Sequence, residues 1–248
     1  MDERWAFVKK KEKQCDPDNP QDRLCGDNWD HTALDPENRL VLSLVPGKRT
    51  AENCEKLVED VKARTGGRTG LLLTTDEHPP YRTAIEKTYA REVPEPRRPG
   101  PGRPPKPKRI LPEDLCYGTV NKTRKQGVVV EVVRTLIFGT AALLDLYLSR
   151  SKVSSQLNTS FVERNNGTER NQNSRKVRKT YTFSKDWAVH NAVSYFVAFS
   201  YNFCWTVRTL RVKGDAGQWQ PRTPAMAAKL AEHVWSTQEW VTYPAKPG

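Results

Sequence analysis

Three consecutive leucines, Leu71 to Leu73, lie between two segments whose apolar residues have helical spacing. A short, continuous apolar run is typical of a strand that is buried on both faces. Before it, Thr50 and Gly66 bound a helical pattern, because Thr caps helix starts and Gly ends helices. After it, Pro79 and Pro80 open a second helix, since proline is tolerated in a first turn. This order predicts a mixed α/β sheet with helices on its faces.

The residues before this region add strands to that sheet. Trp5 to Val8 is a short aromatic and β-branched run, which we expect to be a strand. The turn residues Asp35 to Asn38 divide residues 29–45 into a hairpin. We expect the strand of Trp5 to Val8 to be central and to lie beside the leucine strand.

The segment from Val93 to Ile110 differs from the rest of the chain, with seven prolines and six Lys or Arg against one Glu. It cannot bury a core, so we expect it to be extended or polyproline-like. It is either a solvated linker or a basic arm that follows DNA phosphates. We therefore divide the chain into residues 1–92 and 115–213 of one catalytic domain, an insertion at 93–114 and a C-terminal extension at 214–248.

The second half of the chain repeats the same kinds of pattern. Two β-prone runs, Leu115 to Asn121 and Val128 to Phe138, predict a hairpin whose turn spans Lys122 to Gly127. Helical patterns then cover residues 139–149, 184–205 and 225–235.

The charge balance indicates the class of partner. The formal net charge is +12, with a pI near 9.5, which suits a polyanion such as nucleic acid. The five cysteines form no CxxC pair and no zinc spacing, so we expect reduced thiols in a cytoplasm. Charged and amide residues interrupt both long apolar stretches, so we expect no membrane helix.

Three acids are candidates for chemistry, each with a simpler alternative. Asp76 follows the leucine strand, at the end where α/β sheets bind ligands, but it could cap the next helix. Asp2 precedes the first strand and could be an exposed terminal acid. Glu163 completes the capping-box pattern with Ser160, yet it opens a cationic, amide-rich stretch. The pair Asn166-Gly167 favours a turn there, which conflicts with an uninterrupted helix.

An ordered set of short motifs resembles the transposases of the insertion sequence one family. These motifs are Asp2-Glu3-Arg4-Trp5, Thr75-Asp76 with Pro80-Tyr81, Glu163-Arg164-Asn165-Asn166 with Arg170, and Phe183-Ser184-Lys185 with His190. The resemblance runs from about Asp2 to Trp205. It implies a ribonuclease-H-like domain with a mixed five-stranded sheet flanked by helices.

The resemblance further implies that Asp2, Asp76 and Glu163 form the catalytic DDE triad and hold the metal. Carboxylate oxygens suit two Mg²⁺ or Mn²⁺ ions, which promote attack by water and then by a 3′-hydroxyl on DNA. The expected partners are element-end and target DNA, with a homo-oligomer on DNA, in the nucleoid of a prokaryotic cytoplasm. The residues expected to bind DNA are Arg97, Arg98, Arg103, Arg164, Asn166, Arg170, Arg175, Lys176, Arg178, Lys179 and Lys185.

Two alternatives remain open at this point: a silent DNA-binding remnant of a decayed element, and a ribonuclease-H-like nuclease without strand transfer. Members of the family normally carry a zinc-binding and helix-turn-helix region ahead of the catalytic domain. Because this sequence starts at the first aspartate, we expect the chain to be a truncated or a split reading frame.

Overall fold

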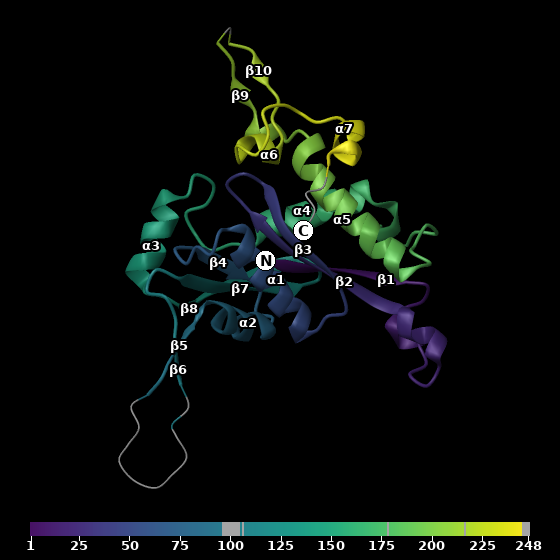
Figure 1. Ribbon diagram of the computed structural model, residues 1–248, viewed down its shortest axis with the longest axis horizontal. Coiled ribbons are helices and arrows are strands. Elements are labelled where there is room, and N and C mark those ends of the chain that lie inside the picture. The colour runs from purple at the N-terminus through teal and green to yellow at the C-terminus, as the bar shows by residue number, and fades with distance from the viewer. Residues whose placement is uncertain (96–104, 106, 178, 216, 245–248) are drawn as a thin grey trace. The chain divides into compact units, whose positions relative to one another are not determined.

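The computed structural model describes residues 1–95, 105, 107–177, 179–215 and 217–244 (Figure 1). Its contacts divide the chain into two compact units. The terminal unit comprises residues 2–49 and 160–248, and the middle unit comprises residue 1 and residues 50–159.

The terminal unit contains a three-stranded antiparallel sheet of β1 (Asp2–Val8), β2 (Gly26–Asp35) and β3 (Leu40–Gly47), in that order. The predicted hairpin is therefore confirmed, and Arg39 at its turn adopts a positive φ of 57°. Strand β1 is longer than predicted, so it includes Asp2. Within this sheet β1 is an edge strand and not the central strand that we expected. Short 3-10 helices at Glu12–Gln14 and Pro20–Leu24 occupy the β1–β2 connection.

Two long helices belong to this unit, α4 (Ser160–Gln172) and α5 (Trp187–Cys204), with the 3-10 helix η3 (Ser174–Lys176) after α4. The carboxylate of Asp186 accepts a hydrogen bond from the backbone of Val189 at 2.8 Å, so α5 starts slightly later than predicted. The side-chain amide of Asn202 bonds both backbone groups of Val41, each at 2.9 Å. Because β3 is an edge strand, Asn202 provides hydrogen bonds that a neighbouring strand would otherwise make.

The tail after α5 contains η4 (Arg208–Leu210), β9 (Val212–Lys213), β10 (Trp219–Gln220), α6 (Pro224–Ala227) and α7 (Thr237–Thr242). The predicted helix at 225–235 is wrong beyond its first turn. Lys229 has a positive φ of 60°, which ends the helix, and Ser236 caps the next one. Aromatic packing of Phe203 with Trp235 at 4.7 Å fixes this tail to the end of α5.

The middle unit contains β4 (Leu72–Thr75), which pairs in parallel with β7 (Cys116–Lys125), and β7 pairs in antiparallel with β8 (Val128–Phe138). The middle unit also contains the helices α1 (Ala51–Arg64), α2 (Pro80–Tyr89) and α3 (Ala141–Arg150). Thr50 caps α1 as predicted, because its hydroxyl oxygen accepts a hydrogen bond from the backbone N–H of Asn53 at 3.4 Å. Thr140 caps α3 in the same way. The amino group of Met1 donates to the carbonyl of Thr74 at 2.6 Å.

The β7–β8 hairpin is tighter than predicted. Strand β7 continues to Lys125, and the turn consists of Gln126 and Gly127 with φ of 52° and 84°. Two consecutive positive φ angles match the twist of flanking strands, which favours a two-residue turn. The expected turn at Lys122 to Gly127 is therefore too long. The cationic residues that suggested a turn belong to strand β7, where they occupy largely exposed positions.

The basic insertion is described only at its base. Strands β5 (Arg91–Val93) and β6 (Lys108–Ile110) pair there in antiparallel, and Arg109 lies 3.5 Å from Glu92. The fold is thus mixed α/β, as predicted. In the described ranges, the strands form sheets of three, three, two and two, and a single five-stranded sheet is not among them.

Candidate functional site

The first candidate acid is bonded to the helix that carries the third. The side-chain amide of Asn166, on α4, donates to a carboxylate oxygen of Asp2, on β1, at 2.8 Å. Asn166 is buried, and its own oxygen Oδ1 has no hydrogen-bond partner among the described residues. Oxygen donors of this kind are the ligands that hard divalent cations prefer, so the local chemistry fits Mg²⁺ or Mn²⁺.

Glu163 lies one helical turn before Asn166. Residues three apart in an α-helix occupy the same face, so Glu163 shares the face of α4 that bonds Asp2. Arg170, four residues after Asn166, continues this face. The helix runs through Gly167 without interruption, which resolves the conflict with the predicted turn.

The alternative role of Glu163 in a capping box stays a prediction beside the catalytic one. Helix α4 begins at Ser160, which makes Ser160 the first helical residue. In a capping box the Ser would lie directly before the helix and the Glu would be its third residue, which differs by one residue from the assigned start of α4. Glu163 is the fourth residue of α4 and is half-buried.

A buried ionic network holds α4 on the sheet. The guanidinium of Arg4, on β1, pairs with Asp30, on β2, and with Glu169, on α4. The ammonium of Lys176, just after α4, pairs with the same Asp30. All four side chains are almost completely buried, and their formal charges cancel. Such a network is strongly sensitive to the loss of one member, which would leave an uncompensated buried charge.

The electrostatics of the network favour the charged forms of Asp30 and Arg4, whereas burial lowers the pKa of Lys176. Burial by itself would raise the pKa of Asp30, but the positive charges of Lys176 and Arg4 outweigh burial and hold that pKa well below its usual range. Asn165 extends the network by donating to Glu169 at 3.2 Å. The network therefore fixes the rotation of α4, and with it the face that presents Glu163 and Asn166.

A neutral histidine lies next to this network. His190 is buried, and its Nδ1 lies 2.6 Å from the hydroxyl of Ser184. Burial, together with the positive charge of Lys176, lowers the pKa of His190 to about 4. The Lys176 ammonium also donates to Ser194 at 2.5 Å, and the Ser194 hydroxyl donates to the His190 carbonyl at 2.7 Å. This histidine is therefore a packed, uncharged core residue at neutral pH.

Asp76 lies in the middle unit, directly after β4. Its carboxylate accepts from the backbone of His78 at 3.2 Å, and the preceding Thr75 bonds the hydroxyl of Tyr117 at 2.8 Å. The N-cap of α2 is Pro79, so Asp76 does not cap that helix, contrary to its simpler alternative. Its position at a strand end agrees with the prediction, and its place in a triad remains a prediction.

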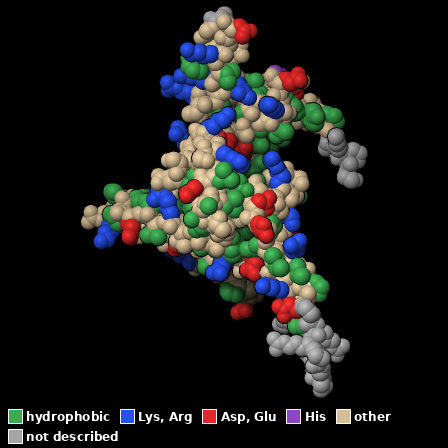
Figure 2. Space-filling view, turned by 90° about the vertical axis from the view of Figure 1, so that its left-hand side faces the viewer, with side chains coloured by type: hydrophobic (Ala, Val, Ile, Leu, Met, Phe, Trp, Pro, Cys, Tyr) green, Lys and Arg blue, Asp and Glu red, His purple; other side chains and the backbone are tan. Residues whose placement is uncertain are grey.

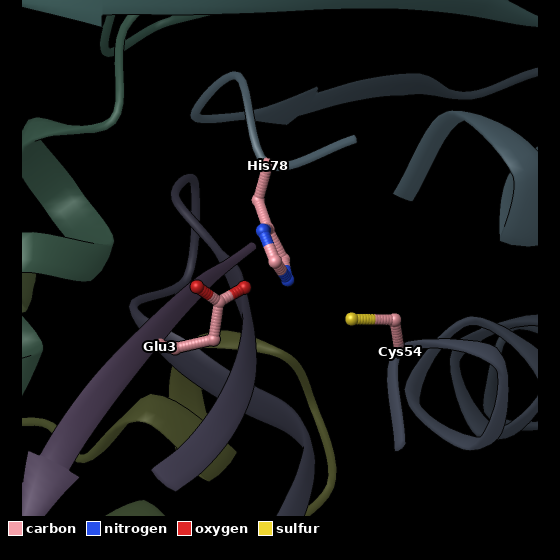
Figure 3. A group of neighbouring side chains, drawn as sticks. All are labelled: Glu3, Cys54 and His78. Carbon is pink, nitrogen blue, oxygen red and sulfur yellow. The ribbon is translucent and has the colours of Figure 1, made fainter. Parts of the chain in front are cut away.

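Two further ligand-type side chains meet in the middle unit. Figure 3 shows Cys54, from the first turn of α1, and His78, from the loop after β4; a ring nitrogen of His78 lies within 4.8 Å of the Cys54 sulfur. Glu3, also drawn there, belongs to the terminal unit, where Arg49 pairs with it at 3.0 Å. Two ligands from one unit are fewer than a zinc site needs, so this pair carries no metal assignment.

The cationic residues expected to bind DNA have different environments. Lys176 is buried in the ionic network and Asn166 is bonded to Asp2, so neither side chain is presented on the surface. Arg164, Lys179 and Lys185 are exposed, whereas Arg170 and Arg175 are half-buried. Arg97, Arg98, Arg103 and Arg178 lie outside the described residues.

Sequence reasoning missed Arg4, Asp30 and Glu169. The one available signal was strand alternation, because Arg4 shares the inward-facing side of β1 with Ala6 and Val8. A charged residue at such a position requires a buried partner. Nothing in the sequence identified that partner.

Comparison with protein-family models, with curated proteins and with solved structures gave no match. Among the described helices, none combines the length and the apolar character needed to cross a membrane.

Proposed function

We propose that this chain is the catalytic part of a DDE transposase, which cuts and joins DNA with the help of divalent metal. The observation that carries the proposal is the bond between Asn166 and Asp2. It brings the first acid of the motif set to the face of α4 that carries Glu163. Asp76, at the end of β4, is the third member of the proposed triad.

In this proposal, Asp2 and Glu163 hold the metal through carboxylate oxygens, and Asn166 orients the Asp2 carboxylate. Bound Mg²⁺ or Mn²⁺ would activate the attacking oxygen and stabilise the leaving one. The ionic network of Arg4, Asp30, Glu169 and Lys176 does not contact the substrate in this proposal. It holds α4 in a fixed rotation on the sheet. The proposal includes the ribonuclease-H-like arrangement, in which strands of one five-stranded sheet carry Asp2 and Asp76 and a helix carries Glu163.

The positive charge of the chain supports DNA as the substrate. Figure 2 shows Lys and Arg side chains over the displayed face, interspersed with Asp and Glu. A net charge of +12 favours association with phosphates through counterion release. A homo-oligomer bound to DNA ends, in a prokaryotic cytoplasm, is part of the same proposal.

The experiment that tests this function uses a labelled DNA end that has already been cut. With Mn²⁺ and a target plasmid, the proposal predicts that the labelled strand becomes joined to the plasmid. A nuclease without strand transfer would shorten the DNA and join nothing. A silent remnant would bind the DNA and leave both molecules unchanged.

A further inference from the structure

The terminal unit contains a pocket of about 340 Å³ on a different side of α4 from Glu163. Its lining residues come from the β2–β3 hairpin, from α4, from α5 and from the chain that leaves α5. Arg164 and Thr168 line it from α4, and these residues, four apart, share one helix face. Its volume falls in the range of roughly 300–1,000 Å³ that is typical of small-ligand sites.

The pocket is cationic. Arg39, Arg164 and Arg208 line it, and none of its described lining residues is Asp or Glu. Burial lowers the pKa of Arg39, and the nearby positive charge of Arg164 lowers it further. In the part of the chain that the structure describes, Arg164 and Arg208 form no ion pair. An anion in the pocket would relieve this repulsion and take bidentate hydrogen bonds from the guanidinium groups.

The pocket also has aromatic walls. The guanidinium of Arg39 lies over the ring of Phe161, 4.0 Å from its centroid. Trp205 also lines the pocket, and 51% of its surface is exposed to solvent. Aromatic faces beside arginines are the surfaces on which nucleic-acid bases stack.

Tyr201 and Asn165 are among the polar residues of the lining, with Thr168, Thr206 and Thr209. Burial raises the pKa of Tyr201 to about 12, so its hydroxyl stays a hydrogen-bond donor. The Oδ1 of buried Asn165 has no hydrogen-bond partner among the described residues.

We propose that this pocket binds one nucleotide of a single-stranded nucleic acid, with its phosphate on the arginines and its base against Trp205 and Phe161. The combination of cations and aromatic faces favours a nucleotide over a simple anion. The site lies wholly in the terminal unit. It does not depend on the proposed strand transfer, and it would exist in a protein without catalytic activity.

The test measures binding of a short fluorescent oligothymidylate to the full chain at fixed salt. Trp205→Leu and Arg208→Gln change exposed residues, so the fold should be retained, which circular dichroism checks. Loss of a stacking face or of a phosphate contact should weaken binding about tenfold. Arg208→Gln should also reduce the salt dependence of log K by about 0.7, the single-strand value for one phosphate contact.

The matched controls are Trp219→Leu and Arg68→Gln. Trp219 is also 51% exposed but lies on β10, outside the pocket, and Arg68 is an exposed arginine of the middle unit. These controls should change binding less than twofold. If the pocket variants bind as tightly as the controls, the pocket is not the binding site and the proposal is wrong.

Competition identifies the ligand chemistry. Thymidine 5′-monophosphate should displace the oligonucleotide from the parent protein but should be a weak competitor with Trp205→Leu. If inorganic phosphate competes equally well, the site binds an anion alone and the nucleotide assignment fails. If duplex DNA shows the same losses with the pocket variants, the assignment to single strands fails.

Discussion

The side-chain amide of Asn166 donates to the carboxylate of Asp2 at 2.8 Å, which bonds helix α4 to strand β1. The two residues are 164 positions apart in the chain, so this bond depends on the folded unit. Its amide donor orients the carboxylate without neutralising its charge. Such an arrangement suits an acid that binds a cation.

Asn166→Ala should release the Asp2 carboxylate. We expect the free energy of unfolding to fall by roughly 1 kcal/mol, the usual contribution of one hydrogen bond. Mn²⁺-dependent DNA cleavage should fall by more than the decrease in the fraction of folded protein accounts for. Urea unfolding and a cleavage assay check both effects. Asn171→Ala, an exposed asparagine of the same helix, is the control and should change neither; equal effects of the two variants would contradict a positioning role.

Lys176→Met should destabilise the terminal unit strongly. It removes one of the two cations that neutralise Asp30, which is completely buried. Breaking a buried pair in this way costs about 3–5 kcal/mol. Chemical denaturation measures this loss, and Lys179→Met, at an exposed site, should stay within about 0.5 kcal/mol. Similar values for the two variants would show that the ionic network does not stabilise the fold.

The elements that local patterns define could be predicted from the sequence. Thr50, the leucine run and the turn at residues 35–38 each carry their own signal, and the structure has α1, β4 and the β2–β3 hairpin at these places. The tail helix was mispredicted because its apolar residues have helical spacing, while a positive φ at Lys229 ends the helix early.

Long-range pairing of charges could not be predicted. Asp30 and Lys176 are 146 residues apart, and each looks like an ordinary surface charge in its own segment. The sequence therefore indicated Lys176 as a DNA contact, whereas its ammonium lies in the core. Only the fold determines which charges become buried, because burial depends on how β1, β2 and α4 pack together.

Stability should depend on pH through His190. Its folded pKa of about 4 lies below the ordinary value near 6.5, so the unfolded state binds more protons between these values. Stability is then complete above about pH 6.5 and falls as the pH decreases towards 4. Denaturation at several pH values should show this slope, and His190→Gln should flatten it. An unchanged slope in His190→Gln would assign the effect to other groups.

The basic insertion should contribute to DNA binding. Replacing Arg97, Arg98, Arg103, Lys106, Lys108 and Arg109 with serine should flatten the salt dependence of binding, by about 0.9 in slope for each lost phosphate contact. Fluorescence anisotropy over a salt series measures this slope. An unchanged slope would identify the segment as a linker.

The most direct test of the proposed function is DNA cleavage by Glu163→Gln with Mn²⁺. Gln keeps the shape and the hydrogen-bond acceptor of Glu but lacks the negative charge that a hard cation requires. We predict that cleavage of a DNA end by this variant falls to background, while DNA affinity and stability stay near those of the parent protein. Glu232→Gln, at an exposed site of the same unit, should cleave normally. Cleavage by Glu163→Gln at the rate of the parent protein, or no cleavage by the parent itself, would contradict the assignment.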